Sequence, residues 1–158
     1  MAGRYEELTG FRGAVGSVDG TTVVFDKEPA RDGAFTAGIS FLSCRLLDRL
    51  ASGPVFFSRK KEYGLQATIV STLTTCITYT MIGFPASIHD ARAYRHTPLS
   101  RHPNSFFTPG QYILADSAYT LTDTVLPIHK KPESLVPENA EWDLEHARAR
   151  VPSEHTMG

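Results

Sequence analysis

The chain has 158 residues, 41% of them hydrophobic, and its 16 basic and 17 acidic residues give a formal net charge of -1. This length fits one domain with a buried core, and the near-neutral charge argues against a protein that coats DNA by charge alone. The sequence has no long apolar run and no basic leader, so we expect neither a membrane span nor a secretory signal. Two distant cysteines, Cys44 and Cys76, favour a reducing, intracellular compartment over a disulfide framework or a zinc site.

The first predicted elements lie within residues 11–25, where the stretch GSVDGTTVVF places Asp19 and Gly20 between two β-branched runs. Asp-Gly between alternating apolar residues is a strong hairpin signal, because both central residues of a type I′ turn need a positive φ. We therefore expect two short strands joined at Asp19-Gly20. Asp19 is then either a turn residue or a metal ligand, and the local pattern leaves both interpretations open.

The next part of the chain divides into an insertion and two strands. Residues 30–54 are interpreted as an insertion, and the punctuated apolar stretch 35–57 is compatible with a short amphipathic helix. Residues 64–82 are rich in Thr, Ile, Val and Tyr, which suit a pleated surface and predict two further strands. We expect about four strands in antiparallel succession.

The second half of the chain alternates between helix and strand. Ser87 and Asp90 stand at the spacing of a capping box and predict a helix over about 88–97. QYILA predicts a short strand that ends at Asp116, a loop-like stretch follows, and NAEWDLEHARAR predicts a helix that meets Pro152. Strands followed by alternating helix and strand predict a mixed α/β layered domain.

Four acidic residues, Asp19, Asp90, Asp116 and Glu154, are candidate metal ligands. Each also has an ordinary explanation as a turn former, a helix cap, a strand end or a solvated helix residue. The first three stand at predicted element ends, where a rigid sheet can direct side chains into one cleft. Mg²⁺ and Mn²⁺ bound for phosphoryl transfer take such hard oxygen ligands, together with waters and substrate phosphates.

Five segments, taken in order, resemble the nuclease domain of PIF/Harbinger-type transposases, which are DDE superfamily endonucleases. They are FRGAVGSVDGTTVVF, FFSRKKEYGLQATIV, MIGFPASIHDARAY, YILADSAYTLTDTVLPIHKKP and HARARVPSEHTMG. The resemblance covers nearly the whole chain except about 30–54. It implies a single endonuclease domain with an RNase H-like α/β fold, a mixed sheet with flanking helices. This fold is expected to be incomplete at the C-terminus, because the sequence stops four residues after Glu154.

The resemblance also implies a role for each acid. Asp19, Asp116 and Glu154 match the family's catalytic carboxylates, and Asp90 matches a further metal position. All four are thus expected to bind a divalent cation, Mg²⁺ or Mn²⁺, at a site that hydrolyses a DNA phosphodiester and then joins a freed 3′ hydroxyl to a new strand.

The same resemblance suggests that Lys60, Arg148 and Arg150 contact DNA, with solvated surface charge as the alternative. It implies a nuclear protein whose partner is DNA, with a separate DNA-binding protein as a further partner. Pro152 is a departure, because an interior proline removes a helix hydrogen bond and would misdirect Glu154 unless a new helix begins there. An inactive relic, or a domesticated DNA- or protein-binding module, therefore stays open beside the nuclease, as does an unrelated α/β domain.

Overall fold

The structure is a computed structural model that describes residue 7, residues 9–26, residue 58, residues 61–72 and residues 74–157. The predicted insertion at about 30–54, with its amphipathic helix, lies outside the described residues. No described helix is both long and apolar enough to cross a membrane.

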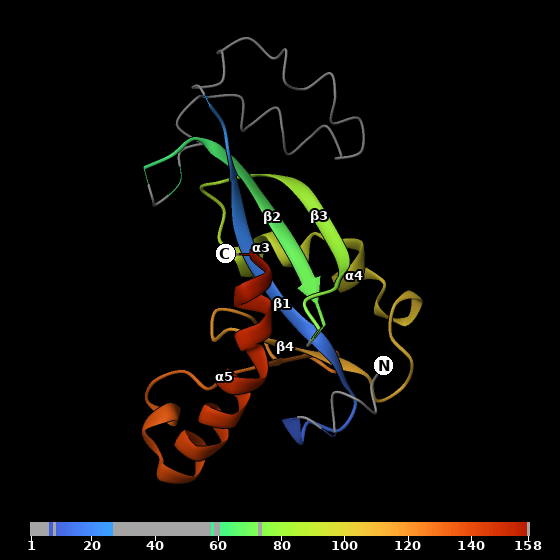
Figure 1. The fold of residues 1–158 in the computed structure, drawn as a ribbon, viewed down its shortest axis with the longest axis vertical. Helices are drawn as coiled ribbons and strands as arrows, with labels where there is room; N and C mark the ends of the chain where they lie inside the picture. The colour runs from blue at the N-terminus through green and yellow to red at the C-terminus, as the bar shows by residue number, and fades with distance from the viewer. Residues whose placement is uncertain (1–6, 8, 27–57, 59–60, 73, 158) are drawn as a thin grey trace.

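A five-stranded mixed sheet forms the centre of the molecule, in the order β3-β2-β1-β4-β5 (Figure 1). The strand β1 pairs antiparallel with β2, which pairs antiparallel with β3, whereas β4 is parallel to both β1 and β5. The strands are β1 (Ala14–Val24), β2 (Gly64–Ser71), β3 (Ile77–Pro85), β4 (Tyr112–Ala115) and β5 (Val125–Pro127). This arrangement confirms the predicted mixed α/β fold and agrees with a DDE nuclease fold.

The predicted hairpin at Asp19-Gly20 is wrong, because both residues lie inside the continuous strand β1. Asp19 pairs with Ile69 and Gly20 with Thr68 of β2, so pairing over a long sequence distance overrides the local turn signal. A glycine stands at position 20 of this strand because a Cβ there would overlap the Asp90 carboxylate. The antiparallel succession consequently has three strands rather than four.

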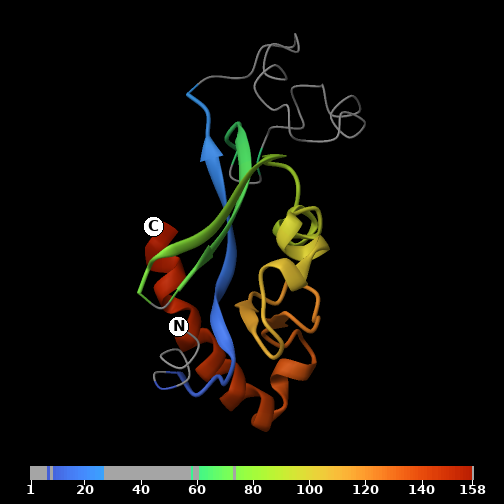
Figure 2. The same cartoon turned by 90° about the vertical axis from the view of Figure 1, so that its right-hand side faces the viewer.

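Helices cover both faces of the sheet (Figure 2). They are α3 (Asp90–Arg95), α4 (Pro98–Arg101) and α5 (Pro137–Met157), with short 3-10 turns η3 (Pro103–Ser105) and η4 (Glu133–Leu135). On the α3 face, eight buried residues form the larger core: Val18, Val70, Tyr94, Leu99, Ile113, Ala115, Tyr119 and Val125. On the α5 face, a smaller core consists of Phe11, Ala14, Leu114 and Ala149.

The predicted helix at 88–97 is shorter than expected, and its capping box is absent. The residue that caps α3 is His89, with no side-chain hydrogen bond, because the Asp90 carboxylate accepts a hydrogen bond from Gln66 of β2 instead. The loop-like stretch after Asp116 contains the three-residue strand β5, which is too short to show a periodic pattern.

The helix α5 continues through Pro152 instead of ending there. Its packing explains why, since His146, Ala149 and Arg150 are buried against the sheet and tertiary packing supplies most helical stability. Glu154 thus belongs to the same helix as Arg150, but its side chain is not among those that the structure describes.

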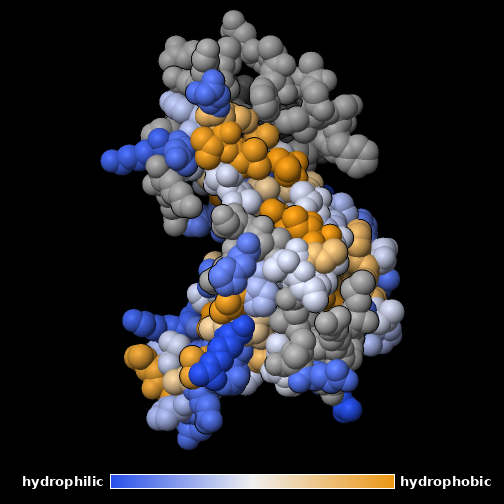
Figure 3. All heavy atoms as spheres, viewed as in Figure 1, coloured by the Kyte–Doolittle hydropathy of each residue, from blue (hydrophilic) through white to orange (hydrophobic). Residues whose placement is uncertain are grey.

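On the face seen in Figure 3, apolar surface gathers over the upper part of the sheet. Large apolar side chains that remain exposed on β1 and β3 include Val23, Val24, Ile77 and Ile82. Val23 and Val24 lie at the end of β1 that follows Asp19, whereas Ile77 begins β3 at the level of Ser17.

We expect stability to fall on mild acidification because of His146. Its side chain is fully buried and its Nε2 donates to the Leu126 carbonyl at 2.9 Å, while burial, and then the charge of Arg150, hold its pKa below the usual value. The unfolded chain takes up a proton near pH 6.5 that the folded chain resists, so stability is full above that pH and is lost below it.

Urea unfolding at pH 7.5 and pH 5.5 measures this loss. His146→Gln should reduce the difference between the two midpoints, whereas His155→Gln, at an exposed position of the same helix, should leave it unchanged. Equal pH dependence in all three proteins would contradict the assignment.

Candidate metal and DNA site

The pairing of β1 with β4 brings two of the predicted acids together. Ser17 stands beside Leu114 in this parallel pair, and extending the register by two residues sets Asp19 beside Asp116, where β4 ends. Neighbouring strands are about 4.8 Å apart, so the backbones at these two positions lie next to each other in the sheet. Asp19 is half-buried, and Asp116 is exposed.

The side chain of Asp19 is directed to the sheet face that α5 covers. Val18 belongs to the core on the α3 face, and side chains alternate along a strand, so Asp19, the next residue of β1, is directed to the opposite face. Asp116 follows Ala115, the last residue of β4. Glu154 lies on α5, so the sheet and this helix bring the backbone positions of all three predicted catalytic acids to one side.

Asp90 approaches β1 from the opposite face, above Gly20. A Cβ at Gly20 would stand 2.1 Å from the Asp90 Oδ1, so only glycine leaves room for the carboxylate. The Gln66 Nε2 donates a short hydrogen bond to the same oxygen, and Gln66 is itself buried. A small cavity of about 210 Å³ adjoins the group and is also lined by Ser87 and His89.

The three aspartates influence one another electrostatically. Burial raises the pKa of Asp90 above its usual value, and the negative charge of Asp19 raises it further. The hydrogen bond from Gln66 opposes this shift by favouring the ionised form, and Asp116 adds a smaller upward contribution. Local backbone donors also satisfy two of the acids, since Gly20 N donates to Asp19 Oδ1 at 2.8 Å and Ser117 N to Asp116 Oδ1 at 2.5 Å.

The chemistry of these carboxylates suits a divalent metal ion. Hard oxygen donors with mutually repelling charges are what Mg²⁺ and Mn²⁺ neutralise. Within the described part of the chain, however, no three acidic, histidine or cysteine side chains are close enough to hold an ion together. Asp19 stands on the strand next to the one that Asp116 follows, so a metal would be held by these two, with the α5 acid and Asp90 as the remaining candidates.

The three predicted DNA contacts have different environments. Arg148 is exposed and forms an ion pair with Glu145 at 2.5 Å. Arg150 is only 8% exposed, and its contact with DNA stays a prediction. Lys60 lies outside the described residues.

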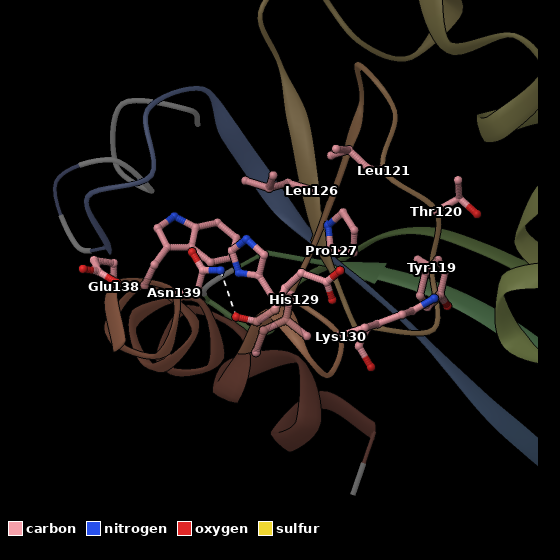
Figure 4. Close-up of a pocket in the computed structure, with 13 residues that line it drawn as sticks. Tyr119, Thr120, Leu121, Leu126, Pro127, His129, Lys130, Glu138 and Asn139 are labelled. Carbon is pink, nitrogen blue, oxygen red and sulfur yellow. Dashed lines mark hydrogen bonds between the residues drawn. The ribbon is translucent and has the colours of Figure 1, made fainter. Parts of the chain in front are cut away.

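A larger cavity of about 820 Å³ lies between the loop after β4 and the beginning of α5 (Figure 4). Tyr119 and Leu121 of the loop, Lys130 after β5 and Trp142 of α5 contribute to its walls. Asn139 Nδ2 donates to the Glu133 carbonyl at 2.9 Å, which joins the start of α5 to η4. Ser117, the residue directly after Asp116, is one of the residues that line the cavity.

A hydrogen bond between His129 and Asp143 supports the wall of this cavity to which His129 belongs. Asp143 accepts hydrogen bonds from both the backbone N and the Nδ1 of His129, at 3.1 and 2.8 Å. The His129 ring also meets Trp142 edge-on, with centroids 4.8 Å apart. These contacts hold the segment after β5 against α5.

Sequence reasoning missed Gln66 and Tyr119 as residues of the site. Gln66 is a polar side chain within an otherwise apolar buried strand, and such a residue signals a buried hydrogen bond. Tyr119 is the buried residue in a loop whose other members are exposed or half-buried, a contrast that the sequence does not show.

A family model described as "DDE superfamily endonuclease" matches residues 18–158 of the chain. No curated protein and no solved structure matches it significantly. The matched range includes all four predicted acids.

We predict that Asp19→Asn lowers the pKa of Asp90, because it removes the larger of the two neighbouring negative charges. Following the Asp90 carboxyl carbon by NMR during a pH titration measures this pKa directly. Asp123→Asn, at an exposed position of the loop before β5, is the matched control and should cause no change. An Asp90 titration that is identical in Asp19→Asn and the wild-type chain would refute the coupling.

Gly20→Ala should destabilise the chain by about 1–3 kcal/mol, because the new Cβ overlaps the Asp90 carboxylate. Urea unfolding of Gly20→Ala, Asp90→Ala and the double variant gives the coupling between the two positions. Once the Asp90 carboxylate is absent, the added methyl should cost much less. Additive effects would show that the overlap with Asp90 is not the cause.

Proposed function

Since this chain belongs to the DDE superfamily endonucleases, we propose that it cleaves DNA phosphodiester bonds with a divalent cation held by Asp19 and Asp116, completed by Glu154. Asp90 is the supporting acid on the other side of β1. The observation that supports the proposal is the parallel pairing of β1 with β4, which brings the strand that contains Asp19 next to the strand that Asp116 follows.

The role of each side chain in this proposal follows from its position. A bound Mg²⁺ or Mn²⁺ supplies positive charge that activates the attacking oxygen and stabilises the leaving one. Asp19 and Asp116 orient that charge from two fixed strands, and Asp90 adds negative potential that strengthens cation binding. The hydrogen bond from Gln66 favours the ionised form of Asp90 and holds its carboxylate over Gly20. No nucleophilic side chain is required.

The proposal extends to properties expected from the resemblance alone. They are the PIF/Harbinger-type transposase subtype, strand transfer after cleavage, a nuclear location and a separate protein partner that recognises the DNA site. The near-neutral net charge supports such a partner, because weak general attraction to DNA leaves target selection to another surface.

A second candidate is a binding module without turnover. One observation favours it, namely the proline inside α5, two residues before Glu154. The two candidates differ in whether the aspartates bind metal and whether the chain cuts DNA.

We predict that the wild-type chain binds Mn²⁺ and that Asp19→Asn/Asp116→Asn weakens this binding about tenfold or more, because two anionic ligands are lost. Calorimetric titration measures the affinity, and nicking of supercoiled plasmid in Mn²⁺ measures cleavage.

Asp123→Asn is the control for the loss of an exposed carboxylate. A folded wild-type chain that binds no Mn²⁺ and nicks no plasmid would reject the nuclease in favour of the binding module. Nicking that persists in the double variant would indicate that other groups perform the cleavage.

A further inference from the structure

The strand β3 forms one edge of the sheet and is paired on one side only, with β2. Its first six residues are exposed or half-buried, and its last three are buried. Two large apolar side chains of the exposed part, Ile77 and Ile82, are 50% and 47% exposed. In the view of Figure 2, β3 crosses in front of the sheet and no described element lies over it. Among the described residues, β3 therefore has an open outer edge.

The backbone of this edge is available for further pairing. In the described part of the chain, the backbone from Tyr79 to Ile82 makes hydrogen bonds only within the sheet. This stretch pairs without interruption with residues 67–70 of β2, between two shifts of register. The unpaired N–H and C=O groups on the outer side of an edge strand form a ladder that another extended chain can complete.

The usual protection of an edge strand is missing from this stretch. Soluble proteins protect such edges with charged side chains, above all lysine, with proline, or with bulges. No charged side chain occurs between Gly64 and Ile88, although 21% of the chain is charged. Pro85 stands at the buried end of β3, and both register shifts lie outside the stretch from Tyr79 to Ile82. An edge of this kind pairs readily with another strand.

The side chains of β3 fit a second copy of the same strand. On the α3 face, Tyr79 Oη lies 3.7 Å from Met81 Sδ, and on the opposite face Thr80 and Ile82 are exposed. A two-fold axis through Thr80 pairs two copies antiparallel, with directly opposite residues on the same face. Tyr79 then stands opposite Met81 of the second copy, and Thr80 opposite Thr80. Aromatic–thioether and Thr–Thr contacts are favourable cross-strand pairs.

The absence of charge supports a second copy over a partner that binds by charge. Two copies bring no like charges together at this edge, whereas a strongly acidic or basic partner finds no opposite charge between Gly64 and Ile88.

We propose that the chain forms a two-fold dimer through β3, in which the two five-stranded sheets join into one continuous sheet. The interface consists mainly of the backbone ladder, so its area is small and the dissociation constant is on the order of 10 µM. Neither DNA nor metal takes part in this contact, so the dimer is independent of the proposed function.

Sedimentation equilibrium over about 1–200 µM, a range that brackets this dissociation constant, tests the proposal. The wild-type chain should dimerise, and Thr80→Lys should weaken dimerisation about tenfold or more, because two added positive charges meet at the axis. Thr120→Lys adds the same charge at an exposed loop position and is the matched control, which should dimerise as the wild-type chain does. Circular dichroism and thermal unfolding check that both variants fold.

A disulfide at the axis tests the register. In a chain with Cys44→Ser and Cys76→Ser, Thr80→Cys places two thiols on directly opposite residues, whose Cα atoms are about 4.5–5.5 Å apart and can be bridged. Oxidation should give a covalent dimer, whereas Thr120→Cys in the same background should give little.

Three results would overturn the dimer. They are a wild-type chain that stays monomeric throughout the concentration range, a folded Thr80→Lys that dimerises as strongly as the wild-type chain, and a covalent dimer that forms equally from Thr80→Cys and Thr120→Cys.

Discussion

The parallel pairing of β1 with β4 is the constraint on which the site depends. The two strands are distant in sequence, yet their pairing brings the strand that contains Asp19 next to the strand that Asp116 follows. The pairing also fixes the end of β4, from which the loop that contains Tyr119 departs. A shift of one residue would turn Asp19 or Asp116 toward the core on the α3 face and separate the two carboxylates. Site and fold are therefore specified by the same hydrogen-bond ladder.

Carboxylates that repel one another lie around β1, and Gly20 and Gln66 accommodate one of them. Gly20 provides the space for Asp90, and Gln66 provides a hydrogen bond that favours the ionised carboxylate against the upward effect of burial and repulsion on its pKa. Among the described residues, the Tyr119 hydroxyl and the Arg150 Nε are buried without a hydrogen-bond partner. Such local imbalance is typical of sites that are completed by a ligand, because groups arranged for a bound ion or phosphate are unsatisfied in its absence.

Sequence patterns predicted the elements that are governed by local composition. The β-branched run at 64–82 became β2 and β3, QYILA became β4, and the last helical pattern became α5. The hairpin at Asp19-Gly20 failed because long-range pairing with β2 outweighs turn propensity, and the capping box failed because Gln66 engages Asp90. The sequence was enough to select the four acids as candidates. It could not show which of them lie on the same face of the sheet, because that depends on the register of strand pairing. Their roles as ligands stay predictions.

Paramagnetic line broadening by Mn²⁺ tests the central claim most directly, because it locates the ion by distance rather than by loss of function. In a ¹⁵N-labelled chain, substoichiometric Mn²⁺ should first broaden the amide signals around Asp19 and Asp116, followed by those around Asp90. Signals around Asp143 and Glu145, whose carboxylates are engaged by His129 and Arg148, should be affected much less. Broadening centred on those residues, or uniform broadening along the chain, would contradict a metal site formed by β1 and β4.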